Sequence, residues 1–397
     1  MQTLWIAYLD TDHLPICSGS PQATHLIEAT APIADIGANT LIVQTGTVSA
    51  IRLSTAVTVC ELPPDMPKFE DRILEPTQRR ARAAFRTQIN AQSGGSQLPE
   101  QAAALIFAVE EAGQLRFYHQ TETTEREMVA LFVAETKANL PEADALLRFN
   151  KALDTLRPVF AEKAPLLGTR RAYLQWRPDM ELERKFTFLD IPDTWALESA
   201  LFAELYGGHY SGYYPEPHMG IQLFDYENHI FEVSAPASEQ GYISFIPQID
   251  GLVTVKRKWF QKNAELRRET LWPGECLDVA ALNKAAHDRV DGELTALPPF
   301  RRKRLDVNYE SLETGHIYGV YFDICTTVGA TVPQRFGQVE VEYCRTRSLH
   351  PLVDVRPEFE MLADHVNAFL KAHDVNFQHD LYSKLDFVRD CAARQGV

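Results

Sequence analysis

The chain has 397 residues, of which 45% are hydrophobic and 23% are charged, proportions that are ordinary for a folded globular protein. Its formal net charge of −15 argues against broad nucleic-acid binding and against adhesion to anionic membranes. No apolar run reaches the roughly 18 residues that a membrane span needs. The six cysteines are scattered without a CxxC pair, a pattern typical of a reduced, cytoplasmic protein with buried thiols.

The length allows two domains, and we predict an α+β domain over residues 1–165. Strand-like runs occupy residues 41–43 and 50–60, and residues 103–119 read as a hairpin. We expect helices over residues 66–92 and 142–160, and the spacing of Thr124 and Glu127 predicts a capping box that opens a helix ending near Ala138. No clustered acids, bases or nucleophiles occur here, so this domain is expected to bind a protein partner, regulate or cover a site.

A connector near residues 162–172 precedes a second predicted domain, residues 173–397, which is rich in strands. One helix is expected after Asp193, a suitable N-cap residue, with leucines at every fourth position. Another is expected to begin at Pro357, because proline is favoured in the first turn of a helix.

The most informative residues are carboxylates that alternate with other residues along two strands of this second domain. Side chains alternate between the two faces of a strand, so Glu181, Glu183 and Lys185 share one face, and Glu340 and Glu342 share another. Two carboxylates about 6.6 Å apart repel each other by about 2.5 kcal/mol at an effective dielectric constant near 20. A fold that gathers four such groups needs a compensating cation, and Mg²⁺ or Mn²⁺ suits oxygen ligands.

Further strands of the second domain also carry charge on one face and apolar residues on the other. The charged positions are Lys256, Lys258, Arg267, Glu269, Arg302, Arg304, Asp306 and Asp323. Each strand alone could be the wet face of an antiparallel sheet. Together, with both signs of charge on so many strands, they favour a closed barrel whose interior holds acids for a metal and bases for a polyanion.

At this point the residues resemble the triphosphate tunnel metalloenzymes, or CYTH superfamily, over about residues 175–390. The family's ordered motifs are ExExK, TxK, RxE, a basic strand, a single aspartate, ExE and a late Ser-Lys. They correspond in this chain to Glu181/Glu183/Lys185, Thr254/Lys256, Arg267/Glu269, Arg302/Arg304, Asp323, Glu340/Glu342 and Ser383/Lys384. The resemblance implies an eight-stranded antiparallel tunnel flanked by helices, in an α+β chain. One strand departs from the pattern, because Glu232 and Ser234 stand where the family carries arginines.

The resemblance also implies roles for the residues and a substrate. Glu181, Glu183, Asp323, Glu340 and Glu342 would hold Mg²⁺ or Mn²⁺, with Glu181, Glu183 and Lys185 catalytic. The side chains that would bind a nucleoside triphosphate or inorganic triphosphate are Lys185, Lys256, Lys258, Arg267, Arg302, Arg304 and Lys384. The reaction would be hydrolysis or a class IV-type adenylate cyclisation. The altered strand keeps a second hypothesis open, a non-catalytic nucleotide or polyphosphate sensor that signals through residues 1–165.

Overall fold

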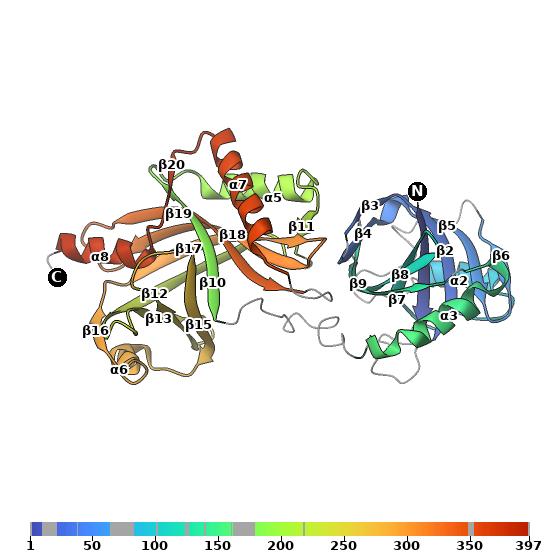
Figure 1. The fold of residues 1–397 in the computed structure, drawn as a ribbon, viewed down its shortest axis with the longest axis horizontal. Coiled ribbons are helices and arrows are strands. Elements are labelled where there is room, and N and C mark those ends of the chain that lie inside the picture. The colour runs from blue at the N-terminus through green and yellow to red at the C-terminus, as the bar shows by residue number, and fades with distance from the viewer. Residues whose placement is uncertain are drawn as a thin grey trace. The chain divides into compact units, whose positions relative to one another are not determined.

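The computed structural model of the chain describes residues 2–9, 22–37, 39–63, 83–100, 102–123, 127–138, 140–159, 161, 179–216, 219–347 and 353–395. The chain forms two compact units (Figure 1). The first comprises Met1–Leu174, Ser311–Gly315 and Arg347–Leu352, and the second comprises Gln175–Glu310, His316–Thr346 and Val353–Val397. The expected connector lies outside the described residues.

The N-terminal unit is built on a curled, nine-stranded antiparallel sheet with the order β3-β4-β9-β8-β7-β1-β2-β5-β6. Its strands are β1 (Gln2–Leu9), β2 (Ala23–Ala31), β3 (Ile33–Ile36), β4 (Thr40–Gln44), β5 (Ser49–Thr55), β6 (Val59–Glu61), β7 (Ala103–Glu111), β8 (Gln114–Thr123) and β9 (Glu127–Lys137). Its helices are α2 (Ala83–Gln92) and α3 (Ala145–Thr155), with short 3₁₀ turns at Thr45–Thr47 and Glu142–Asp144.

Both faces of this sheet are buried, and the interior strand β1 shows how. Leu4 and Ile6 pack in one core with α2, whereas Trp5 and Ala7 pack in the other with α3. Strands covered on both sides read as nearly continuous apolar runs, because no position needs to face water.

The predicted helix from Thr124 to Ala138 is wrong, because Glu127–Lys137 is strand β9. This strand pairs with β4 on one side and β8 on the other. Ala130 and Leu131 belong to different cores, so the segment is buried on both faces. An apolar run of this kind carries no strand periodicity and is easily mistaken for a helix. Thr124 lies outside the described residues.

The other expectations for the N-terminal unit fare better. The predicted hairpin is confirmed as β7 and β8, which are joined at Ala112 and Gly113. The expected strand over 50–60 is two strands, β5 and β6, that pair across a turn. Of the expected helix over 66–92, the structure describes α2, and residues 66–82 lie outside the described part.

The C-terminal unit is a closed, eight-stranded antiparallel barrel with helices around it, as the sequence predicts. Its strands are β10 (Met180–Phe188), β12 (Gln222–Ala235), β13 (Gly241–Pro247), β14 (Val253–Trp259), β15 (Leu266–Glu275), β17 (Phe300–Ser311), β18 (His316–Thr327) and β19 (Arg335–Thr346). The ring runs β17-β18-β19-β10-β15-β14-β13-β12, and pairing between β12 and β17 closes it. The short strands β11 (Tyr213–Pro215), β16 (Glu293–Ala296) and β20 (Phe377–Asp380) attach at its margins.

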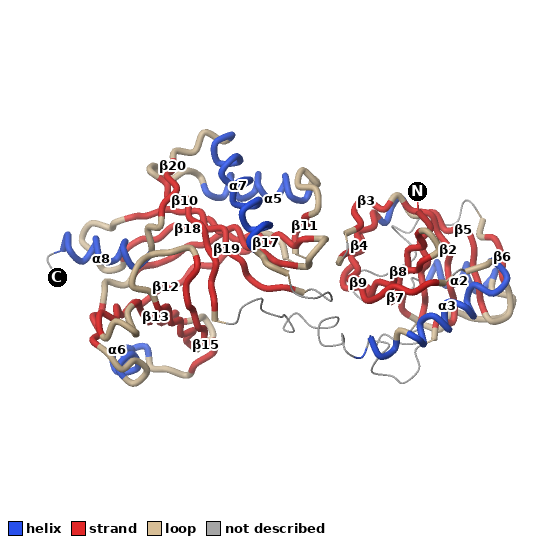
Figure 2. Tube along the Cα trace, in the orientation of Figure 1, coloured by secondary structure: helices blue, strands red, loops and turns tan. Residues whose placement is uncertain are grey.

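Helices α5 (Thr194–Tyr206) and α7 (Arg356–Ala372) bury their apolar faces against the outside of the barrel (Figures 1 and 2). The Asp193 side chain caps α5 by accepting a hydrogen bond from the amide of Ala196, as predicted. Pro357 lies in the first turn of α7. Helix α6 (Leu282–His287), preceded by a 3₁₀ turn at Val279–Ala281, packs over β12–β14. Helix α8 (Lys384–Gln395) shares an apolar cluster with Ile230 and Tyr242.

Within the described residues, no helix is both long and apolar enough to cross a membrane. The five described cysteines are all free thiols. Cys325 and Cys391 are buried, as expected, but Cys276 is exposed, so the expectation of buried thiols is wrong at that position.

Candidate functional site: an ionic tunnel

The register of three neighbouring strands brings the predicted carboxylates together. Strand β10 pairs with β19 so that Glu183 lies opposite Glu342, and Lys185 lies opposite Glu340. On its other side β10 pairs with β15, which places Glu181 opposite Arg267. The intervening residues on β19, Val339 and Val341, pack in the outer core, so the charged side chains face the interior.

These charged side chains line one internal cavity. Its walls are Glu181, Glu183, Lys185, Tyr242, Lys256, Lys258, Arg267, Arg302, Arg304, Glu340, Glu342, Ser383 and Lys384. Basic side chains outnumber acidic ones in this lining, which favours a bound anion. The free volume is only about 40 Å³, enough for very few water molecules, because the side chains fill the interior by pairing with one another.

Three carboxylates form the densest group. One oxygen from each of Glu181, Glu183 and Glu342 lies within 4.8 Å of the others. The sequence prediction that Glu183 and Glu342 share one cavity is therefore confirmed. Oxygen ligands at this spacing suit a hard divalent cation, so these residues fit the metal that the sequence suggests.

The surroundings of the three carboxylates differ. Burial alone would raise the pKa of Glu181, but Lys258 and Arg267 outweigh it and hold that pKa well below the ordinary range. Glu183 pairs with Lys185 at 2.5 Å and also contacts Arg267. For Glu342 the described residues show no ion pair, and burial together with the nearby Glu181 raises its pKa to about 8. The group is therefore short of positive charge on the Glu342 side.

Asp323 and Glu340 form a second acidic group that basic side chains already hold. Arg302 and Arg304 each donate to Asp323 from Nε at 2.9 Å, and Arg304 also donates to Glu340 at 2.7 Å. Lys384, at the start of α8, lies 3.0 Å from Asp323 and also pairs with Glu340. The predicted set of five metal-binding carboxylates thus divides into two groups. Glu181, Glu183 and Glu342 cluster together, with an ion pair shown among the described residues for the first two only, and Asp323 and Glu340 share Arg302, Arg304 and Lys384.

A third group continues the ionic wall along β14 and β15. Lys256 and Lys258 pair with Glu269 at 2.8 Å and 3.2 Å. Burial would lower the pKa of Lys256, but Glu269 outweighs that effect and the pKa is raised. Both lysines therefore carry their charge inside the tunnel.

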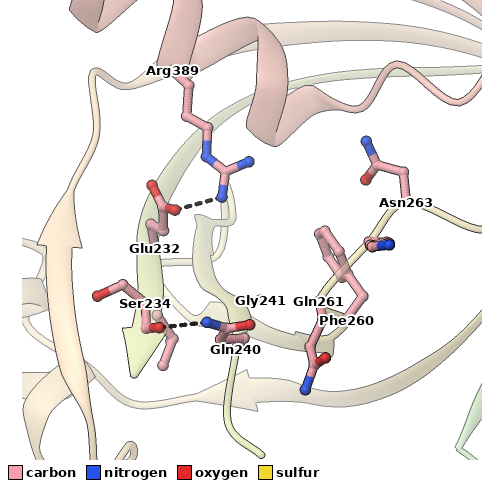
Figure 3. Close-up of a pocket in the computed structure, with 10 residues that line it drawn as sticks. Glu232, Ser234, Gln240, Gly241, Phe260, Gln261, Asn263 and Arg389 are labelled. Carbon is pink, nitrogen blue, oxygen red and sulfur yellow. Dashed lines mark hydrogen bonds and ion pairs between the residues drawn. The ribbon is translucent and has the colours of Figure 1, made fainter. Parts of the chain in front are cut away.

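Strand β12 contributes no arginine to this interior within its described length. At the positions where the resemblance leads one to expect arginines, Glu232 forms an ion pair with Arg389 of α8, and Ser234 accepts a hydrogen bond from Gln240 through its backbone oxygen (Figure 3). The arginine at this end of the barrel therefore comes from helix α8 and not from β12.

Sequence reasoning missed a buried acid beyond the predicted site. Glu216 accepts a hydrogen bond from Asn308 at 2.7 Å and pairs with Arg345. It follows β11 in a loop where no periodicity marks it. Nearby Asp306 has its pKa raised to about 7, chiefly by burial.

No protein-family model and no curated protein sequence matches the chain. Among solved structures, it is similar to HpAC1 from Hippeastrum, for which a dominant triphosphatase activity is described. The identity is 15% and the TM-score 0.30, over 54% of this chain and 96% of that one. It is also similar to the Pct1 RNA triphosphatase of S. pombe, with 12% identity and a TM-score of 0.22, over 50% of this chain and 85% of that one.

The C-terminal unit has the closed, eight-stranded antiparallel tunnel that the sequence resemblance implies.

Proposed function

We propose that the tunnel is the active site of a divalent-metal-dependent enzyme that hydrolyses a triphosphate. The observation that carries this proposal is the joint presence, in one closed cavity, of a metal-sized carboxylate cluster and a surplus of lysine and arginine. A site for a polyanion alone would gain nothing from the carboxylates. A site for a metal alone would not need so many cations beside it.

Glu181, Glu183 and Glu342 would hold Mg²⁺ or Mn²⁺, and the elevated pKa of Glu342 is what a site lacking its cation should show. When bound, such an ion neutralises charge on phosphate oxygens and lowers the pKa of a bound water. Asp323 and Glu340 are the remaining candidate ligands, but both are held by Arg302, Arg304 and Lys384.

The basic side chains would bind the phosphates by exchanging partners. In the structure, Lys185, Lys258 and Arg267 are paired with carboxylates of the cluster. A triphosphate would replace those carboxylates as their partner. Arginine contributes bidentate contacts and lysine a point charge. Arg302 and Arg304 are therefore suited to hold one phosphate in a set orientation. Because the cavity is nearly full, the ion pairs that line it, here called the cage, have to open before the substrate can enter.

The proposed reaction is attack of a water molecule on the terminal phosphorus. The new P–O bond forms as the bond to the bridging oxygen breaks, and orthophosphate and a diphosphate leave. A cyclase would use the same cage differently, because a ribose 3′-hydroxyl would attack the α-phosphorus and release pyrophosphate. Hydrolysis is favoured because it needs no group beyond the cage.

The competing function is a non-catalytic sensor of a nucleotide or polyphosphate. The absence of arginine from the described part of β12, where Glu232 and Ser234 stand instead, favours it, since it weakens the hold on phosphate. In that case residues 1–165 would transmit the bound state to a protein partner. We propose a partner-binding or regulatory role for this domain under either function, and a cytoplasmic location.

The test is release of phosphate from inorganic triphosphate and the common nucleoside triphosphates, with Mg²⁺, with Mn²⁺ and with EDTA. We expect turnover only with metal, and none in the Glu183→Gln variant. Glu227→Gln is the matched control, because Glu227 is a half-exposed glutamate on β12 whose ion pair among the described residues is with His229 alone, at 3.6 Å. Binding of triphosphate without turnover would favour the sensor, and equal activity in EDTA would exclude the metal mechanism.

A further inference from the structure

A second pocket lies at the end of the barrel that α8 covers (Figure 3). It is lined by the ends of β12 and β13, by the segment after β14 and by α8, it is partly open to solvent, and its volume is about 410 Å³. That is ten times the free volume of the cavity that holds Glu181, Glu183 and Glu342, here called the carboxylate cavity. It also lies within the range of small-molecule sites, about 300–1,000 Å³. Unlike the carboxylate cavity, this pocket has room for a ligand as it stands.

Strand β14 leads from the cage to this pocket. Lys256, Lys258 and Phe260 occupy alternate positions, so they follow one face in steps of about 6.6 Å. The amide of Phe260 donates to the carbonyl oxygen of Gln240 at 2.9 Å, which extends the pairing with β13 beyond the last strand residue. A phosphate chain held by the two lysines would therefore end within reach of the pocket.

The Phe260 ring separates the two cavities. It lies edge-on to Tyr242, with ring centroids 6.0 Å apart, and the Arg267 guanidinium lies 5.3 Å from its centroid. Tyr242 and Arg267 both line the carboxylate cavity, whereas Phe260 lines the pocket. A ligand that spans both cavities must pass this ring.

The rest of the lining offers amides and little unbalanced charge. Gln240, Gln261 and Asn263 bring side-chain amides to the pocket. The Nδ2 of Asn263 donates to Asp386 at 2.7 Å, and because a carboxylate only accepts, this fixes the amide orientation. The Asn263 oxygen then has no hydrogen-bond partner among the described residues.

The charges in the pocket favour a neutral ligand over a further phosphate. Arg389 is paired with Glu232 and also lies 3.3 Å from Asp386, so its charge is already balanced. Lys262 is the one lining cation for which the described residues show no ion pair. An aromatic ring, several amides and a nearly balanced charge suit the flat, polar-edged shape of a nucleobase.

We propose that this pocket binds the nucleoside of a nucleoside triphosphate whose phosphates occupy the tunnel. Phe260 stacks on the base, and the amides bond its edge. The Glu232–Arg389 pair, which stands where the resemblance leads one to expect tunnel arginines, shapes this end for a nucleoside. The inference rests on the proposed function, because it names the substrate class of the same tunnel.

The test compares kcat/KM of the full chain for inorganic triphosphate and for ATP, GTP, CTP and UTP, with Mg²⁺ present. Stacking of a base on an aromatic side chain strengthens binding about ten-fold. The kcat/KM for the best nucleotide should therefore exceed that for inorganic triphosphate by about the same factor. Phe260→Leu should remove this advantage and leave the kcat/KM for inorganic triphosphate unchanged. Phe202→Leu, at a half-buried phenylalanine of α5, is the matched control and should change neither.

Because Phe260 also packs against the apolar cluster beside α8, a second variant is needed. Gln261 is exposed, so Gln261→Ala should fold normally and lower kcat/KM for the best nucleotide alone by several-fold. Equal values for inorganic triphosphate and every nucleotide would overturn the inference and leave the proposed hydrolysis intact. An equal loss on both substrate types in Phe260→Leu and Gln261→Ala would also overturn it. Turnover of no triphosphate would overturn the proposed function itself.

Discussion

Glu342 should destabilise the metal-free protein, and the effect should depend on pH. Burial and the neighbouring Glu181 raise its pKa to about 8, from an ordinary value of 4.5. Between those two values the unfolded chain loses the proton while the folded chain keeps it. The folded state therefore loses stability as pH rises through this interval. At about 1.36 kcal/mol per pH unit, the penalty at pH 7 is about 3 kcal/mol.

We predict that Glu342→Gln removes this penalty while abolishing metal-dependent turnover. In EDTA at pH 7 to 8 the variant should melt several degrees above the wild type, since a domain of this size gains about 2–4 °C for each kcal/mol. Near pH 4.5 the two proteins should melt together, because both then carry an uncharged side chain.

The neighbouring Glu340 supplies a contrast on the same strand. Lys384 and Arg302 outweigh its burial and hold its pKa well below the ordinary range, so this carboxylate stabilises the fold above pH 4.5. Glu340→Gln should therefore cost about 3–5 kcal/mol, and this cost should stay nearly constant from about pH 8 down to about pH 4.5 and shrink only below that. Thermal melting of both variants from pH 4.5 to 8 is the assay. A Glu342→Gln variant that melts below the wild type, or whose melting temperature differs from it equally at every pH, would refute this interpretation of the cluster.

Three further outcomes are expected. Mg²⁺ at about 100 times its Kd should stabilise the wild type by about 2.7 kcal/mol in melting or denaturant titrations, and Glu181→Gln should lose that gain; equal stabilisation would place the ion elsewhere. Lys384→Ala should lower stability at pH 7 by about 3–5 kcal/mol, because it leaves Asp323 and Glu340 short of a cation; an unchanged melting curve would show that the two arginines suffice. A fragment of residues 173–397 should fold and bind triphosphate with Mg²⁺ in calorimetric titration; a folded fragment that does not bind would show that the first domain contributes to the site.

The tunnel was predictable because its strands have one apolar and one charged face. Alternation alone fixes which residues share a side, so Glu181, Glu183 and Lys185 could be assigned to one face before their partners were known. Alternation does not fix which strands become neighbours. The division of the five carboxylates depends on that pairing, because Asp323 sits opposite Arg304 in the β17–β18 register.

Where the alternation is absent, prediction failed for a physical reason. Strand β9 is buried on both faces, so its sequence shows neither strand nor helix periodicity, and a chance capping pattern favoured the wrong element. The Glu232–Arg389 pair joins residues 157 positions apart, and no local pattern links them. Such contacts depend on how α8 packs at the end of the barrel.

We propose that the three clustered glutamates hold the metal needed for hydrolysis of a triphosphate. The most direct test is the rate of phosphate release from a triphosphate with saturating Mg²⁺, measured side by side for wild type, Glu183→Gln and the control Glu227→Gln. We expect release by the wild type and the control, none by Glu183→Gln, and none by any of them in EDTA. Release by Glu183→Gln at the wild-type rate would contradict it.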